Sequence, residues 1–352
     1  MNNPQMGRTK RGFSLVELMV ALTIASLLLL GLATLFVNNS KARSELDKSS
    51  RQIENGRYAM QVLFDELRHA GYYGALITRP ILPVSVVVLP DPCSQVLSEV
   101  RNAMGLAIQG YAGAANAAAL DPGNLACLNT SAASYKANTG VLVVRRADTL
   151  IAGATPTANY FNIQTSGCLS DVVPYVVDVP SGTFNMHSNA GGCTPATTVN
   201  TIAPLYTRIY FVSNCSGTDC SAAGADTVPT LKRLDVRMTG ASPIITPIVD
   251  GIEDLQLDYG IDTTAAPGDG TPDVYTNTPV THPAVTPTTP AEWVNVMSVR
   301  VSLLARNIDE SGIPDTKTYT LGPRAAYAPG GSFRRHAYNA LVRLYNVAQV
   351  RE

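Results

Sequence analysis

Residues 11–37 read RGFSLVELMVALTIASLLLLGLATLFV, and this stretch decides how the chain is organised. From Phe13 to Val37 the run holds one charged residue, Glu17. At about 1.5 Å per residue a helix of this length is ~37 Å long, enough to cross the ~30 Å hydrocarbon layer of a membrane. The segment therefore predicts a membrane-spanning helix.

The residues before this run predict its orientation. Arg8, Lys10 and Arg11 precede it with no acidic residue, so the N-terminus stays cytoplasmic and the rest is exported. A secretory signal has a shorter apolar region, of about 7–15 residues, followed by a small-residue cleavage site. Here Gly12 precedes the run, so cleavage after Gly12 leaves the helix on the mature chain. The simplest alternative is a plain membrane anchor.

Glu17 argues against a plain anchor. A carboxylate five residues into an apolar helix costs several kcal/mol in hydrocarbon unless a positive group pairs with it. A helix that assembles against other helices can obtain such a partner from a neighbour. The new amine of Phe13, exposed by cleavage after Gly12, is a group of this kind.

The residues Arg11-Gly12-Phe13-Ser14-Leu15-Val16-Glu17-Leu18 resemble the class III signal of type IV prepilins and type II secretion pseudopilins. The resemblance implies that prepilin peptidase cleaves after Gly12 and that Phe13 becomes the methylated N-terminal residue. It also implies that Glu17 pairs with the N-terminus of a neighbouring subunit. Loss of the leader, residues 1–12, leaves 23 basic and 27 acidic residues, a formal net charge of -4.

The helix is expected to continue beyond the membrane, from about Phe13 to His69. Residues 41–69 contain no proline and one glycine, and Gly71 and Gly74 supply a stop signal. Apolar residues at intervals of 7, 7, 4 and 3 form one stripe: Leu46, Ile53, Met60, Phe64 and Leu67. We expect the stripe from Ile53 to Leu67 to pack on the protein's own sheet. The charged residues around it face solvent or neighbouring subunits, and the sequence does not separate these.

Three further segments resemble PilW-type minor pilins: Lys41–Gly74, Val249–Asp262 and Val299–Arg306. The resemblance covers the first 75 residues and the region from about 229 to 350, and residues 80–228 contain no motif that can be placed. It implies a minor pilin that helps to prime type IV pilus assembly and to form the pilus tip complex. The implied partners are prepilin peptidase, other minor pilins, the major pilin, the inner-membrane assembly platform and a pilus-tip adhesin. The implied location is the inner membrane, with a periplasmic body, and then the pilus tip or cell surface.

The exported part reads as β structure, because its apolar runs are short, β-branched and bounded by turn residues. The expected strands are Ile81–Leu89, Gly140–Arg146, Leu205–Val212, Leu231–Met238, Ile252–Tyr259, Val294–Leu304, Thr316–Leu321 and Asn339–Val347. They follow one another without helical crossovers, which predicts a mainly antiparallel arrangement, in two sheets or with a long insertion. A short surface helix is expected within residues 94–120, and long surface loops over residues 151–200 and 262–291.

The fold class expected is α+β, with a long N-terminal helix packed on this antiparallel body. The expected divisions are a leader at 1–12, a transmembrane and assembly half of the helix at 13–37, an amphipathic half at 38–74, and a β-rich domain at 75–352. No internal repeat is evident.

Six cysteines fit three disulfide bonds in an exported protein: Cys93, Cys127, Cys168, Cys193, Cys215 and Cys220. Pairing each cysteine with its nearest neighbour gives 93–127, 168–193 and 215–220. Fifteen connectivities are formally open. The rival interpretation, a zinc site, would require CxxC pairs, which are absent.

A search for catalytic chemistry indicates no enzyme and no cofactor. The chain has no GxSxG, HExxH or P-loop motif, and no GxGxxG before a helix. The four histidines are interpreted as surface or capping residues: His69, His187, His282 and His336. Asp262, Asp269 and Asp273 form a weak calcium candidate, because a turn can offer oxygen ligands. Their spacing is not that of an EF-hand, so a turn bend is favoured and no metal is predicted.

The formal net charge of -1 excludes binding to nucleic acid by bulk electrostatics, and no specific nucleic-acid partner is predicted. The densest basic spots are Arg145-Arg146 and Arg334-Arg335, the latter flanked by Phe333 and Tyr338. Both pairs are interpreted as charges that protect edge strands. Two alternative functions stay open: a J-type minor pseudopilin of type II secretion, and a membrane-anchored periplasmic enzyme or binding protein.

Overall fold

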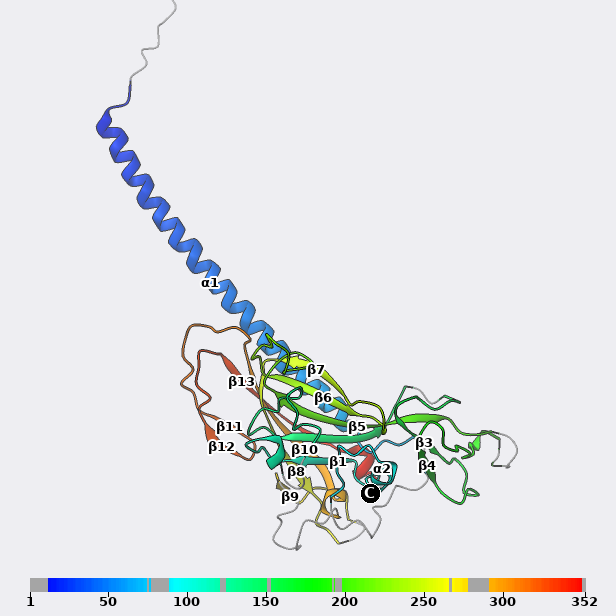
Figure 1. The fold of residues 1–352 in the computed structure, drawn as a ribbon. Helices are drawn as coiled ribbons and strands as arrows, with labels where there is room; N and C mark the ends of the chain where they lie inside the picture. Colours follow the sequence, from blue (N-terminus) through cyan, green and yellow to red (C-terminus); the bar gives the residue numbers. More distant parts are fainter. Residues whose placement is uncertain are drawn as a thin grey trace, which may run out of the picture. The chain divides into compact units, whose positions relative to one another are not determined.

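The computed structural model describes residues 12–74, 76, 89–120, 125–150, 153–191, 193, 198–265, 268–277 and 291–349. It divides into two compact units, one up to Ser50 and one from Arg51 onward. Helix α1 (Leu15–Arg68) begins in the first unit and ends in the second (Figure 1). The predicted long N-terminal helix is confirmed, with ends within two residues of those expected.

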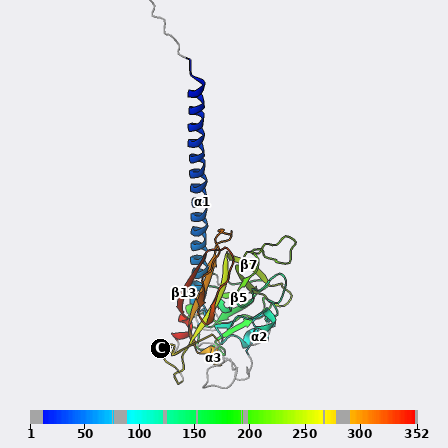
Figure 2. The same cartoon turned by 90° about the vertical axis from the view of Figure 1, so that its left-hand side faces the viewer.

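The second unit contains three antiparallel sheets (Figure 2). The seven-stranded sheet contains β1 (Ile108–Tyr111), β2 (Val141–Ala147), β3 (Phe161–Thr165), β4 (Tyr175–Asp178), β5 (Ile202–Ser213), β6 (Thr230–Val236) and β7 (Ile244–Asp250). Its order is β1-β2-β5-β3-β4, and β6 pairs with the second part of β5 and with β7. The α+β fold class and its antiparallel body are confirmed.

The four-stranded sheet has the order β13-β10-β8-β9: β13 (Arg335–Arg343), β10 (Val296–Arg306), β8 (Ile252–Ile261) and β9 (Val274–Thr276). A two-stranded hairpin is made of β11 (Tyr319–Leu321) and β12 (Arg324–Tyr327). The described part of the unit also contains three short α-helices, α2 (Leu97–Asn102), α3 (Ala291–Val294) and α4 (Tyr345–Ala348), and the 3₁₀ helices η1 (Ala117–Ala119) and η2 (Asn189–Gly191). Helix α2 is the short helix expected within residues 94–120.

The main hydrophobic core joins the end of α1 to both larger sheets. Ala59, Leu63 and Leu67 of α1 are fully buried in one cluster with Val144 of β2 and Val301 of β10. A second cluster covers the other face of the seven-stranded sheet, where Val143 and Phe211 pack with apolar residues from 117–120 and 125–135. Because β2 is buried on both faces, its first four residues, Val141 to Val144, form a continuous apolar run rather than an alternating one.

The expected packing of the stripe is confirmed for Leu67, which is buried, and for Met60 and Phe64, which pack against the main core, but not for Ile53. The buried residues of α1 are Gln52, Gly56, Ala59, Leu63, Glu66 and Leu67, whereas Ile53 is 45% exposed and Leu46 is 70% exposed. The reason is the close approach of β13: a Cβ atom on Gly56 would lie 2.2 Å from the ring of Tyr338. The buried face of α1 therefore includes small and polar residues, which a search for regularly spaced apolar residues does not find.

The prediction that residues 151–200 form only surface loops is wrong, because β3 and β4 lie there. The buried side chains of Asn162 and Gln164 in β3 donate to the carbonyls of Tyr160 and Asn200. Strand β3 thus lacks the continuous apolar run from which a strand is expected, because Asn162 and Gln164 occupy two of its buried positions. Strand β9 similarly lies within the predicted loop 262–291, whose residues 278–290 are outside the described part. Of the predicted strand Ile81–Leu89, only Leu89 is described.

The predicted strand Asn339–Val347 is right only as far as Arg343, where β13 ends. The chain then turns into α4, which buries Val347 and Ala348. The amide of Asn346 donates to the carbonyls of Arg68 and Ala70, at 3.2 and 3.1 Å, at the C-terminus of α1. The last carbonyl groups of a helix need hydrogen-bond donors from outside it. Asn346 is such a donor, so the chain turns here instead of continuing the strand that the alternating pattern predicts.

Three disulfide bonds join Cys93 to Cys127, Cys168 to Cys193, and Cys215 to Cys220. This is the nearest-neighbour pairing expected from the sequence. Cys93 and Cys127 pack against the second core cluster, and the Cys215–Cys220 bond closes part of the loop between β5 and β6.

Gly110 in β1 gives a first test of this packing. An added Cβ would lie 1.6 Å from the hydroxyl oxygen of Tyr259, whose side chain is fully buried. We expect Gly110→Ala to lower the free energy of unfolding by about 1–3 kcal/mol, since the core has no space for the ring to move. Urea unfolding of the full chain in detergent measures this through the fluorescence of Trp293, the single tryptophan.

Gly153→Ala is the matched control, because its Cβ would meet no atom closer than 3.8 Å. It should change the free energy of unfolding by less than about 0.5 kcal/mol. An equal effect of the two substitutions would contradict the packing described for Gly110.

Candidate assembly site

The Gly12–Phe13 bond lies just before the first residue of α1, Leu15. Gly12 has open space around the position of a Cβ, and Phe13 is 84% exposed. The first helical hydrogen bond runs from the amide of Leu18 to the carbonyl of Ser14. The bond therefore lies outside the helix.

Glu17 lies in the first turn of α1. A negative charge is favourable there, because the unpaired amide groups of the helix N-terminus carry partial positive charge. Within the described residues the Glu17 carboxylate has no ion-pair partner.

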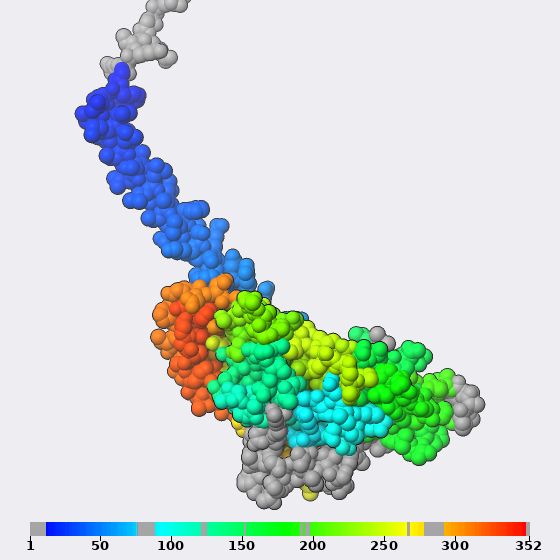
Figure 3. All heavy atoms as spheres, viewed as in Figure 1, coloured from blue at the N-terminus to red at the C-terminus, as the bar shows by residue number. Residues whose placement is uncertain are grey.

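The first unit has apolar side chains on all sides of α1. Every large apolar side chain from Leu15 to Val37 is at least 48% exposed. Figure 3 draws the atoms of this stretch of α1 in blue. The hydroxyls of Thr23, Ser26 and Thr34 donate to carbonyls of their own helix at 2.8–2.9 Å. Among the described residues, α1 is the one helix with the length and composition to cross a membrane. An all-round apolar helix with satisfied hydroxyls suits lipid or a bundle of similar helices.

In the second unit, the end of α1 is held by a buried charged network. Glu66 accepts from Arg146 of β2 at 2.8 Å and from Arg208 of β5 at 3.0 Å. Arg208 also pairs with Asp235 of β6 at 3.1 Å, and Asp235 pairs with Arg233 at 2.9 Å. The side chains of Glu66, Arg146 and Arg208 are no more than 13% exposed. Burial raises the pKa of Glu66, but the bonds and charges of Arg146 and Arg208 outweigh this and lower it.

Two further polar contacts hold the same part of α1. The amide of Gln52 donates to the carbonyl of Ala305 at 2.9 Å, and the amide of Asn55 donates to that of Asp250 at 3.0 Å. These bonds reach the ends of β10 and β7. The orientation of this half of the helix is thus specified by polar groups as well as by apolar packing.

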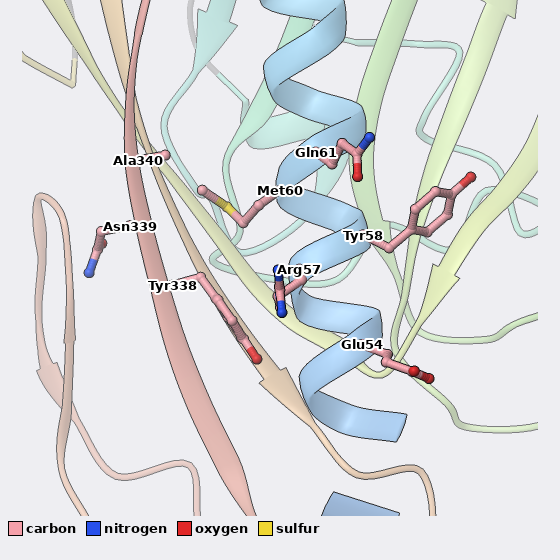
Figure 4. Close-up of a pocket in the computed structure, with 8 residues that line it drawn as sticks. All are labelled: Glu54, Arg57, Tyr58, Met60, Gln61, Tyr338, Asn339 and Ala340. Carbon is pink, nitrogen blue, oxygen red and sulfur yellow. The ribbon is translucent and has the colours of Figure 1, made fainter. Parts of the chain in front are cut away.

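A groove of about 660 Å³ lies between α1 and the edge strand β13 (Figure 4). Its walls are Glu54, Arg57, Tyr58, Met60, Gln61, Tyr338, Asn339 and Ala340. The hydroxyl of Tyr338 donates to the carbonyl of Ile53 at 3.3 Å. None of its eight lining residues is a serine, cysteine or histidine.

The calcium candidate is a turn. Asp262 accepts from the amides of Thr264, Asp269 and Gly270, and Asp273 accepts from Thr263. Among the residues that the structure describes, no group of three carboxylate, imidazole or thiol side chains is arranged to hold a metal ion. The carboxylate oxygens offered as ligands are instead used to form the bend.

The interpretation of Arg145-Arg146 as edge-strand charges is wrong, because β2 lies between β1 and β5. Arg145 is 3% exposed and donates to Gln109 at 2.9 Å, while Arg146 binds Glu66. Arg335 does lie on an edge strand, but its guanidinium is buried between Glu253 and Asp315. Neither pair forms the basic patch that nucleic-acid binding requires.

His187 is more than a surface residue. Its Nδ1 atom lies 2.6 Å from Asp171, which also accepts from Ser166 at 2.5 Å. These hydrogen bonds lower the pKa of Asp171 to about 2. Sequence reasoning missed this cluster, whose members lie 5 and 16 residues from Asp171, and it missed the Glu66 network, in which Glu66 and Arg208 are 142 residues apart. His69 and His336 are exposed, as expected, and His282 is outside the described residues.

Two segments of the chain are similar to known protein families. Residues 209–346 match the family described as Type IV Pilus-assembly protein W. Residues 7–33 match the prokaryotic N-terminal methylation motif. The resemblance to PilW-type pilins is confirmed. The PilW-type region includes β6 to β13, and therefore the whole four-stranded sheet.

Among solved structures, the type IV-like pilin TTHA1219 from Thermus thermophilus is similar, with 10% identity and a TM-score of 0.27. The likeness covers 61% of this chain and 81% of that chain. No curated protein sequence matches the chain.

Glu66→Gln tests the network that holds α1. Loss of the charge leaves Arg146 and Arg208 buried without their shared partner, so we expect the free energy of unfolding at pH 7 to fall by about 3 kcal/mol. Because the folded pKa of Glu66 is lowered, its contribution is present above its usual value of 4.5 and is lost as pH falls. The difference between variant and wild type should therefore shrink in acid.

Glu54→Gln is the control, since Glu54 lies on the same helix with an exposed side chain. Urea unfolding of both variants at pH 7 and at pH 3 gives the comparison. A Glu66→Gln chain as stable as Glu54→Gln at pH 7 would show that the network does not stabilise the fold.

Proposed function

We propose that this chain is a minor pilin that helps to prime type IV pilus assembly and to form the pilus tip complex. The observation that carries the proposal is the exposed apolar half of α1, with Glu17 as its one charged residue from Phe13 to Val37. The prepilin motif at residues 7–33 and the PilW-type region at residues 209–346 support it.

In this proposal the chain has four functional parts. Prepilin peptidase removes residues 1–12 by cleaving between Gly12 and Phe13, and the amine of Phe13 is methylated. Residues 13–37 leave the bilayer for a bundle of similar helices. Residues 38–74 connect this half to the β-rich part, residues 75–352, in the periplasm and later at the pilus tip or cell surface.

Glu17 supplies the driving interaction. In lipid its carboxylate is costly, and pairing with the amine of a neighbouring subunit removes that cost, so assembly is favoured over the free membrane state. The partners are other minor pilins, the major pilin, the inner-membrane assembly platform and a pilus-tip adhesin. A protein that works by insertion in this way requires no catalytic centre and no cofactor.

Glu17→Ala tests the assembly step. The variant should accumulate in the membrane at the wild-type level but be recovered from sheared pili at roughly one tenth of it or less, since the lost pairing is worth about 2.5–3.5 kcal/mol. Immunoblots of the membrane and sheared fractions measure this. Glu54→Gln, which changes an exposed charge farther along α1, is the control. Equal recovery of Glu17→Ala and wild type would overturn the role assigned to Glu17.

An in-frame deletion in a strain that cannot retract pili tests the proposed system. We expect few or no surface pili with normal secretion of exported enzymes. Normal pili with enzymes trapped in the periplasm would instead identify a J-type pseudopilin of type II secretion.

A further inference from the structure

Lys232 of β6 is fully buried, which is unusual for a lysine. Its ammonium donates to the carbonyl of Gly217 and lies 3.5 Å from Sγ of Cys215 and 3.3 Å from Sγ of Cys220. Both sulfurs of one disulfide are thus in contact with the same cation. Burial lowers the pKa of Lys232, while the carboxylates of Asp226, Asp219 and Asp250 act in the opposite direction.

The other two disulfides have different surroundings. The sulfurs of Cys168 and Cys193 lie 3.6–3.7 Å from the carbonyl oxygens of Ser188 and Gly167, and Cys215 has a similar contact with the carbonyl of Gly217 at 3.6 Å, so the difference lies in the cation. Cys93 accepts from the backbone amide of Cys127 at 3.3 Å. Among the described contacts, only the Cys215–Cys220 bond is adjacent to a cationic side chain.

The position of this bond also favours exchange. Cys215 is 2% exposed, whereas Cys220 is half-buried at the end of the exposed loop between β5 and β6. The bond spans five positions in sequence, against 34 and 25 for the others, so its reduction releases the least chain. The carboxylates of Asp219 and Asp226 on this loop accept from Ser221 and Ser216 rather than from Lys232.

We propose that Cys215–Cys220 is a thiol–disulfide exchange site for a dithiol, with Lys232 as the group that stabilises the leaving thiolate. A thiolate of the dithiol attacks Sγ of Cys220, and the Cys215–Cys220 bond breaks. Cys215 leaves with the electron pair as a thiolate beside the Lys232 ammonium. The second thiol of the dithiol then attacks the mixed disulfide and releases Cys220, so that two electrons pass from the dithiol to the protein.

A nearby cation favours this chemistry because it lowers the free energy of the thiolate, which is both the leaving group and the product. The loop between β5 and β6 lies within the PilW-type region. Reduction there would free the loop residues 216–219 without affecting the other two disulfides. The site is independent of the helix-insertion function proposed for α1.

The test is a redox titration of the full chain in detergent with mixtures of reduced and oxidised dithiothreitol. Each of the three cysteine pairs is trapped with a maleimide and quantified by peptide mass spectrometry. We expect Cys215–Cys220 to be half reduced at a ratio of reduced to oxidised reagent about tenfold lower than Cys168–Cys193 requires. Simultaneous reduction of all three pairs, or reduction of Cys215–Cys220 last, would overturn the proposal.

Lys232→Gln removes the charge while keeping a donor for the carbonyl of Gly217, and it should abolish the tenfold preference. Lys232→Arg keeps the charge and should retain the preference, and Lys317→Gln is an exposed control that should not alter it. Fluorescence of Trp293 checks that each variant is folded. An unchanged preference in folded Lys232→Gln would overturn the role of Lys232. If Lys232→Gln does not fold, the proposal is tested by the order in which the three disulfides of the wild-type chain are reduced.

Discussion

Glu66 carries a charge at a buried position, where it needs partners of opposite charge. This requirement determines how the end of α1 packs in the second unit. A buried carboxylate without cationic partners is strongly destabilising. Here Arg146 and Arg208 supply the partners from adjacent strands β2 and β5, and Asp235 extends the network to β6. The network therefore fixes the rotation of α1 about its axis, because Gln52, Gly56, Ala59 and Leu63 lie on the same face as Glu66.

The sequence of α1 changes in character along the helix. From Leu15 to Val37 its surface is apolar in all directions, which suits lipid or a helix bundle. From Gln52 onward its buried face combines leucines with small and polar residues: Gly56 allows the close approach of β13, and Glu66 finds its partners on β2 and β5. One continuous helix thus satisfies two environments, and each environment can be recognised from the residue types it requires.

Sequence reasoning found the features that depend on local pattern. The long helix, the nearest-neighbour disulfides and strands β2, β5, β6, β8 and β10 follow from apolar runs and cysteine spacing. It failed where polar side chains are buried. Asn162 and Gln164 made β3 look like a loop, because their hydrogen-bond partners are separated in the sequence or lie in the backbone. The sequence also did not indicate the network around Glu66 or the contact of Lys232 with a disulfide, because the partners are separated in the sequence.

The most direct measurement is the mass of the N-terminal peptide of this chain, recovered separately from membranes and from sheared pili. The account predicts a mature chain that begins at Phe13, with a methylated amine, and that is present in the pilus fraction. A chain that retains residues 1–12, or that is processed but absent from sheared pili, would contradict it.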